Sequence, residues 1–271
     1  MKKEVLYYLV IAALAVSATF ASCSKCECDC DKVKLLETIT YNGNLYLKFE
    51  YDNENRITKM IDYDENGDIT QECTLTYNAS GVLTSENYLG KGTITFPKNE
   101  NKITIDWRPN ANQTITYELF NDDFPFNYEL AHYNAHCTNS TNTKSFVYQN
   151  DNLIQVAWQS AIECNNPYSS GTREYTYDDK KSPFYHCKTP KWYLLYKVWY
   201  FEEWIVSKNN VKTETHFHEF VAETGFVPIT ETVTYVLEYY DDGFLKSRSC
   251  TSNYDNETFS YSFTYKTHKR K

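Results

Sequence analysis

Apolar and polar residues alternate along much of this chain, which is the pattern of β-strands with one buried face. The clearest alternating stretches are 45–51, 69–77, 115–119, 233–239 and 261–265. In the first of them, every second residue is Leu, Phe or Tyr, and the residues between are Tyr, Lys and Glu. The pattern predicts antiparallel strands that each turn one side towards a core.

A turn unit separates several of these strands and repeats along the chain. Three copies align at 51–57, 63–69 and 77–83; each begins with Tyr and Asp or Asn and ends with Ile or Leu. The Asp or Asn accepts hydrogen bonds from nearby backbone, and Gly or Asn takes the position with positive φ. A degraded copy follows at 148–153, a clearer copy at 240–245 and a partial copy at 254–256.

The predicted fold is all-β. Regularly spaced turns favour a long up-and-down antiparallel meander, which curls into an open barrel or porin-like sheet because strands twist and edges need cover. A membrane-spanning barrel is not expected, because the strand at 57–63 is shorter than the 9–11 or so residues that spanning needs. Lys59 and Gln71 would also interrupt its lipid-facing surface.

A short aromatic helix or loop near 184–206 is predicted to interrupt the sheet. Trp192, Leu195, Tyr196 and Trp199 recur at the three- and four-residue spacing of one helix face. If buried, these side chains would plug the end of the curled sheet. If exposed, Trp192, Tyr196 and Trp199 would form a ligand platform for a sugar ring or a protein partner, which requires Trp192 and Trp199 to be partly exposed.

The N-terminus predicts export and anchoring. Residues 1–22 fit a lipoprotein signal peptide, with a basic start, an apolar run too short for a membrane span, and small residues before Cys23. The stretch 20–23 resembles a lipobox, in which the thiol of Cys23 receives the lipid that holds the protein on the membrane. The alternative is ordinary cleavage after residues 16–18, which yields a soluble exported protein.

Two further regions follow the predicted cleavage site. Residues 23–35 predict a flexible acidic tether, whose alternating cysteines suit a linker, extra acylation, disulfide exchange or a soft metal. Residues 36–268 predict a single curled β-sheet domain. The last residues, 268–271, are basic and predict a solvated tail.

Composition narrows the classes of partner. The net charge of −9 argues against nucleic acid, which is bound through basic patches. The 25 Tyr, 15 Phe and 5 Trp suit pleated, half-buried surfaces. The number of cysteines in the body is odd, so at least one is free or pairs with the tether; they are Cys73, Cys137, Cys164, Cys187 and Cys250.

Several of these motifs together resemble a family of uncharacterised Bacteroidota lipoproteins, a domain of unknown function with a porin-like fold. The motifs are the lipobox, the Tyr-Asp-x-x-Gly-x-Leu turns, the segment 175–184 and the segment 207–211. The turns are also similar to the YD repeats of large secreted shell-forming proteins. The resemblance covers about 35–266 and implies a curled, barrel-like sheet at the outer membrane or cell surface, on its periplasmic or outer side. It implies no catalytic residue.

Two sets of residues are candidate metal ligands. Asp62, Asp64 and Asn66 match the opening of a calcium-binding EF-hand loop, although Cys73 replaces the final Glu and the repeated turn explains the same residues. His216 and His218 would lie on one face of a strand and could seat zinc, but no partner His or Cys stands at a fixed spacing, and chance alternation on a wet face is the favoured explanation. No cofactor is predicted.

Three functions remain open at this point. The leading hypothesis is non-enzymatic binding of a glycan or protein partner at the envelope. The second is a structural or assembly subunit of an envelope complex. The third is a glycan hydrolase, which would need two carboxylates in one cleft, although the chain lacks a nucleophile elbow, a phosphate-binding Gly-rich loop and a zinc-protease helix.

Overall fold

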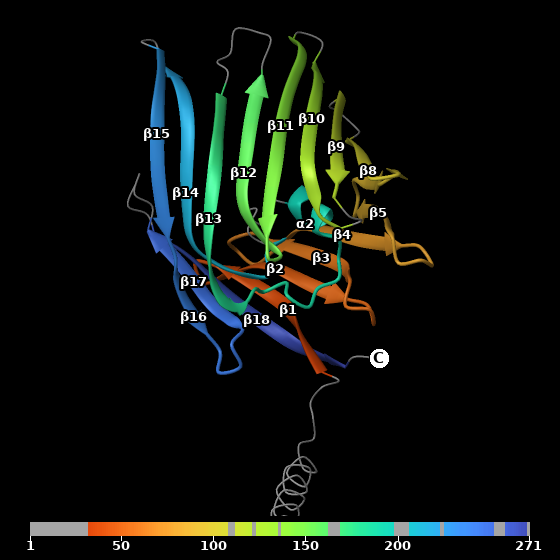
Figure 1. The fold of residues 1–271 in the computed structure, drawn as a ribbon. Coiled ribbons are helices and arrows are strands. Elements are labelled where there is room, and N and C mark those ends of the chain that lie inside the picture. The colour runs from red at the N-terminus through yellow and green to blue at the C-terminus, as the bar shows by residue number, and fades with distance from the viewer. Residues whose placement is uncertain are drawn as a thin grey trace, which may run out of the picture.

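The computed structural model describes residues 32–107, 112–120, 123–134, 137–161, 169–197, 206–222, 225–251 and 258–269. Its strands form two antiparallel sheets, and a short helix, α2 (Lys191–Tyr196), lies between them (Figure 1). The prediction of an all-β antiparallel fold with a short aromatic insertion is therefore confirmed. No described helix is long and apolar enough to cross a membrane.

Sheet A contains the strands from both ends of the described chain. Its order across the sheet is β16 (Val236–Tyr239), β17 (Leu245–Thr251), β18 (Thr258–Lys269), β1 (Lys32–Tyr41), β2 (Asn44–Tyr51), β3 (Ile57–Tyr63), β4 (Ile69–Tyr77), β5 (Leu83–Tyr88) and β6 (Gly92–Thr95).

Sheet B contains the middle of the chain and has the longer strands. Its order is β15 (Gly225–Thr234), β14 (Asn209–Ala222), β13 (Ser169–Lys181), β12 (Asn152–Ala161), β11 (Cys137–Gln149), β10 (Pro125–Asn134), β9 (Asn112–Leu119), β8 (Lys102–Trp107) and β7 (Lys98–Asn99).

Consecutive strands are neighbours within each sheet, which is the predicted up-and-down meander. The meander breaks into two sheets at two corners, and among the described strands neither sheet closes on itself. At one corner, Phe96 N–H bonds to sheet A while the carbonyl of Pro97, which has no N–H of its own, accepts from sheet B. At the other, Tyr235 separates β15 from β16, so one extended segment passes from sheet B into sheet A.

The repeated turns share one hydrogen-bond pattern. Oδ1 of Asp52 accepts from the N–H of Glu54 and of Arg56, at 2.9 and 3.0 Å. The equivalent Oδ1 atoms of Asp64 and Asn78 accept from the residues two and four places later, at 2.9 to 3.0 Å. This side chain therefore replaces a strand partner where the ladder ends, as predicted for Asp and Asn in turns.

The copy near residue 240 begins one residue earlier than the sequence alignment placed it. Tyr239, and not Tyr240, pairs with Leu245, just as Tyr51 pairs with Ile57. Gly243 has φ of 80°, a conformation that favours glycine and matches Gly67 and Gly81 in the earlier turns, at 84° and 81°.

The aromatic insertion lies within another copy of the same turn, between its two halves. Tyr177 pairs with Val211, and Oδ1 of Asp178 accepts from the N–H of Lys180 and of Asn210, each at 3.0 Å. Asn210 directly precedes the partner of the tyrosine, as Arg56 does in the first turn. The segment between them thus leaves and re-enters the sheet at one closed turn.

Two hydroxyl groups fasten this insertion to both sheets in the same way. Thr189 Oγ1 accepts from the N–H of Ile57 at 2.7 Å and lies 3.2 Å from the hydroxyl of Tyr77. Ser207 Oγ accepts from the N–H of Leu153 at 3.0 Å and lies 2.8 Å from the hydroxyl of Tyr177. The segments 175–184 and 207–211 therefore hold the insertion in place.

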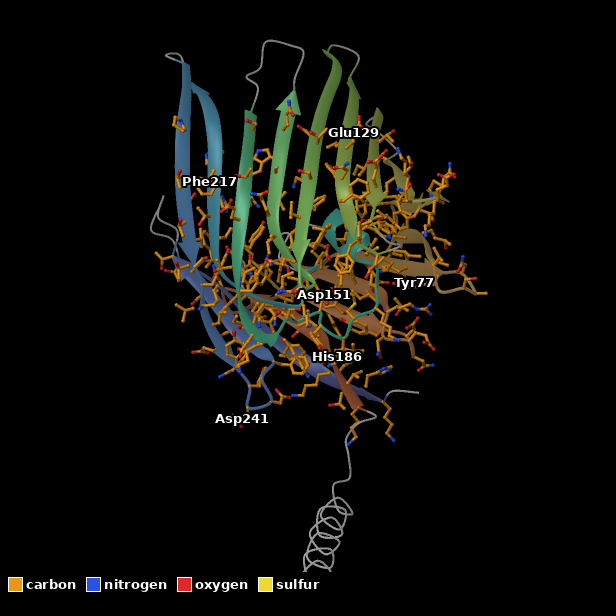
Figure 2. The ribbon with its side chains drawn as sticks, viewed as in Figure 1. Tyr77, Glu129, Asp151, His186, Phe217 and Asp241 are labelled. Atoms are coloured by element: carbon orange, nitrogen blue, oxygen red, sulfur yellow. The ribbon has the colours of Figure 1, made fainter. Side chains whose placement is uncertain are left out.

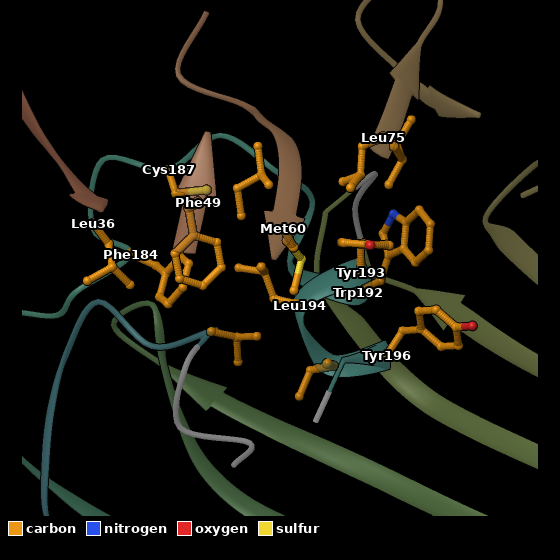
Figure 3. Close-up of a cluster of buried hydrophobic side chains, with 14 of the residues drawn as sticks. Leu36, Phe49, Met60, Leu75, Phe184, Cys187, Trp192, Tyr193, Leu194 and Tyr196 are labelled. Atoms are coloured by element: carbon orange, nitrogen blue, oxygen red, sulfur yellow. The ribbon is translucent and has the colours of Figure 1, made fainter. Parts of the chain in front are cut away.

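The insertion forms the centre of the core (Figure 3). Trp192 is 2% exposed and Tyr196 is 8% exposed, and Phe96 contacts both rings edge-on. The interpretation of the insertion as a buried plug is confirmed, and the expected exposure of Trp192 is wrong, because the two sheets close over α2 from both sides. Trp199 lies outside the described residues.

The described strands also shift the predicted domain boundaries. The signal peptide 1–22, Cys23 and the start of the tether lie outside the described residues. Residues 32–35, which were assigned to the tether, belong to β1, because Leu35 is buried and pairs with Lys266 of β18. Residue 269 also belongs to β18 and is not part of a solvated tail. Among the described cysteine side chains, Cys73 and Cys187 are free thiols.

Candidate functional site

A shallow groove of about 560 Å³ crosses sheet B from β10 to β15. The strand register shows which side of the sheet it occupies, since residues directly opposite in an antiparallel ladder share a face. Val156 and Phe146 are buried core residues and pair with each other. The next pair, Ala157 with Ser145, therefore points away from the core, and both line the groove.

Two rows of side chains on this outer face make up the groove. The first row pairs Ala157 with Thr172 and Thr172 with Phe217, and the second pairs Gln159 with Ser170. The described lining residues on this face are Asn127, Thr143, Ser145, Ala157, Gln159, Ser170, Thr172, Phe217, Pro228 and Thr230. The lining residues between the rows, which face the other way, are Lys144, Trp158, Gly171, His218 and Ile229.

The outer-face lining is neutral and rich in hydrogen-bonding groups. Its described lining residues carry hydroxyl and amide side chains and no carboxylate or cation, although Glu129 stands next to them, directly opposite Thr143. Phe217, labelled in Figure 2, is 39% exposed and adds an aromatic face beside Thr172. Hydroxyl and amide groups both donate and accept hydrogen bonds, and an aromatic face packs on apolar C–H surfaces.

The floor of the groove is supported from behind by Trp158. A Cβ at Gly171 would lie 2.6 Å from Cη2 of Trp158 and 2.5 Å from the carbonyl oxygen of Phe217, so only glycine fits there. The guanidinium of Arg173 lies 5.7 Å from the Trp158 ring centroid, within cation–π range. The backbone under the groove is therefore held by close packing on its core side.

The two histidines beside Phe217 lie on the same side of sheet B as Val156 and are partly exposed. Nε2 of His216 lies 2.5 Å from Oε1 of Glu214, which is buried, and Tyr235 donates to Oε2 at 2.9 Å. Burial acts to raise the pKa of Glu214, but the hydrogen bond with His216 and the charge of Arg173 outweigh it and hold the pKa below its ordinary value. This pair holds the imidazole of His216 on the inner side.

The predicted metal ligands have other partners in the structure. Asp64 uses Oδ1 for the turn that includes Asn66, whereas Asp62 lies on β3 and is buried opposite Leu47. His216 is bound by Glu214, as described above. Among the described residues, no three His, Cys, Asp or Glu side chains gather in a way that could hold a metal ion.

A second group of ionisable side chains is sealed beneath the plug. Lys197 Nζ lies 2.6 Å from Oε2 of Glu86, and the hydroxyl of Tyr193 donates to the same oxygen at 2.7 Å. The ammonium also hydrogen-bonds to the hydroxyl of Tyr88. Burial raises the pKa of the nearby Cys73 thiol to about 12. At 4% and 0% exposure, Lys197 and Glu86 stabilise the core and offer no entry to a ligand.

The chain resembles known proteins only at the level of the fold. No protein-family model matches it, and no curated protein matches it. A porin-like protein from Bacteroides vulgatus, whose crystal structure is at 2.80 Å, is 11% identical over 78% of this chain and 99% of its own, with a TM-score of 0.39. A porin-like protein from Bacteroides uniformis, at 2.32 Å, is 14% identical over 87% and 97%, with a TM-score of 0.34. Likenesses at these scores carry no argument about function.

Sequence reasoning missed the groove and singled out its neighbours instead. Phe217 stands between the two histidines that were considered as ligands. The alternation of three large side chains does not show whether Phe217 or the histidines face solvent. Glu214, two places before His216 and on the same side, would favour solvent for that side, so the sequence does not reveal the observed orientation.

Proposed function

We propose that this protein is a lipid-anchored envelope protein that binds a glycan in the groove of sheet B without transforming it. The observation that carries the proposal is the exposed ring of Phe217 within a neutral surface of hydroxyl and amide groups. Sugars present hydroxyls at their edges and C–H groups on their faces, and this lining offers a partner for each.

Two further features support binding over hydrolysis or metal chemistry. Glycoside hydrolysis uses two carboxylates flanking the bond, and none stands among the described lining residues. The groove is open and lies on regular strands, which suits a chain-like ligand that rests on the surface.

Glycan binding can be tested with the full chain purified in detergent and titrated calorimetrically with a panel of neutral oligosaccharides. We expect one class of sugar to bind. Phe217→Ala should raise its dissociation constant about tenfold, because one stacking contact is lost. Phe120→Ala is the matched control, because Phe120 is 81% exposed and lies outside the groove. Equal affinity of both variants, or no binding by the folded wild type, would overturn the proposal.

Lipid attachment is tested separately in a bacterial host fed an alkyne-tagged fatty acid. We expect the tag to appear on the wild-type chain and to disappear in Cys23→Ser, which removes the thiol that receives the lipid. Cys250→Ser is the control, since Cys250 belongs to the folded domain. A tag that persists in Cys23→Ser would show that the anchor is elsewhere.

A further inference from the structure

The paired ends of β1 and β18 carry a concentration of lysines. Lys32 stands directly opposite Lys269 in the ladder, and Lys266 stands opposite Leu35 three steps further along. Both Lys32 and Lys269 are exposed. Like charges placed opposite each other destabilise a sheet, so the fold tolerates a cost at this position.

Neighbouring turns add to this surface. Nδ1 of His268 lies 2.9 Å from Oδ1 of Asn55, whose carbonyl accepts from the N–H of Lys188. The side chain of Lys188 is exposed. We call this end of the two strands the basic pole, and its members are Lys32, Lys188, Lys266, His268 and Lys269; Lys32 and Lys269 lie on one face of the ladder, and Lys266 and His268 lie on the other.

Two acidic residues near the basic pole pair with other cations, whereas Glu54, in the turn of Asn55, is exposed. Asp242 pairs with Lys34, and Asp52 pairs with Arg56 at 2.6 Å. The chain as a whole has a charge of −9, so a cluster of lysines departs from the average surface. An anionic partner at this end would offset the repulsion between Lys32 and Lys269.

We propose that the basic pole rests on the anionic lipid headgroups of the membrane that holds the anchor. This inference rests on the proposed lipid attachment at Cys23. Eight residues separate Cys23 from Lys32, and an extended chain of that length spans at most about 30 Å. The tether therefore keeps this end of the domain close to the bilayer.

Electrostatic contact requires a shorter distance than the tether alone ensures. Charges in physiological salt are screened beyond about 8 Å, so the lysines act only when the pole lies against the headgroups. Each lysine near an anionic leaflet strengthens binding about fivefold. Several lysines together thus convert a loosely tethered domain into one with a preferred orientation.

The orientation has a direct effect on the groove. The C-terminus and the start of β1 lie at one end of the molecule, and the far ends of β10–β15 lie at the other (Figure 1). Ser170 and Gln159, which line the groove, stand near those far ends, next to Ser169 and Ala161 where β13 begins and β12 ends. A domain resting on its basic pole presents the groove away from the membrane.

The experiment mixes the processed full chain with vesicles of phosphatidylcholine alone or of phosphatidylcholine with phosphatidylglycerol. Sedimentation reports binding, and an amine-reactive reagent read by mass spectrometry reports the exposure of each lysine. We expect Lys32, Lys188 and Lys269 to react several-fold more slowly on the anionic vesicles, and the difference to vanish in high salt. Lys91, on the hairpin of β5 and β6, should react equally on both.

Charge reversal supplies the second arm. Lys32→Glu with Lys269→Glu should abolish the slower reaction of Lys188 on anionic vesicles, whereas Lys91→Glu should leave it. Binding to both vesicle types with equal lysine reactivity would overturn the basic pole and leave the anchor standing. Binding to anionic vesicles alone would support the pole and remove the anchor, and binding to neither would overturn both.

Discussion

Lys197 and Glu86 form a salt bridge in the interior of this protein, with 2.6 Å between Nζ and Oε2 and almost no exposure of either side chain. Lys197 ends the helix of the plug, and Glu86 lies on β5 of sheet A. The rings of Tyr88, Tyr193 and Tyr196 surround the ammonium at 4.6 to 5.4 Å from their centroids. The pair therefore fastens the plug to one sheet at a point that water does not reach.

Removing the lysine should leave a buried carboxylate without its partner. We expect Lys197→Met to lower the free energy of unfolding by about 3–5 kcal/mol, measured by urea denaturation. Adding Glu86→Gln to the same chain should restore part of the loss, because it removes the uncompensated charge. If the double variant is as unstable as the sum of the single changes, the two residues do not act as a pair.

Asp178 should matter more than the aspartates of simple turns. It accepts from the N–H of Lys180 and of Asn210 and from the hydroxyl of Tyr239, and so joins the insertion to both sheets. We expect Asp178→Ala to cost about 3 kcal/mol and Asp64→Ala about 1 kcal/mol in urea unfolding. Asp64→Asn keeps the accepting oxygen and should be nearly neutral. An equal loss of unfolding free energy at both positions would contradict the role of Asp178 in joining the insertion to both sheets.

Gly171 should resist enlargement. A methyl group there meets the Trp158 indole and the carbonyl of Phe217, so Gly171→Ala should cost about 1–3 kcal/mol as overpacking. The backbone under the groove should shift as well, so the affinity for a glycan should fall with it. Ala157→Ser, on the neighbouring strand β12 and on the outer face, serves as the control for stability. Differential scanning calorimetry on the three proteins gives the comparison.

Stability should fall in acid partly through Glu214. Its pKa is held below the ordinary value in the folded state, so its contribution is complete above the unfolded pKa of about 4.3 and is lost as the pH falls through the folded pKa. Glu214→Gln should therefore be less stable at neutral pH and should flatten the decline below about pH 4.3. Glu129→Gln, on an exposed site of β10, should keep the wild-type slope. Urea midpoints measured across the pH range decide between them.

Local chemistry explains what could be predicted from the sequence. The turn at Asp52 and its copies depend on a few adjacent residues, so their spacing revealed the meander before any contact was known. The one-residue error at Tyr239 arose because the aspartates at 241 and 242 resemble the turn more closely than Tyr240, which takes the Asx position through its backbone.

Long-range packing explains what could not be predicted. The spacing of Trp192 and Tyr196 identifies a helix face but not whether a sheet covers it, and here sheets cover it from both sides. The groove depends on which face of β14 turns inward, and that choice is made by Glu214 together with Arg173 of the adjacent strand. Neither the corners near Pro97 and Tyr235 nor the division into two sheets leaves a periodic signal.

The pairing of β1 with β18 also has a consequence for biogenesis. Thr38 and Thr264, whose hydroxyls lie 2.6 Å apart across these strands, are 226 residues distant in the chain. The first strand to emerge during synthesis must therefore wait for the last, and such distant contacts slow folding. Until the C-terminal strand arrives, an open edge beside β1 offers its backbone to any other extended chain. A cell that makes this protein has to shield that edge through nearly the whole of its synthesis.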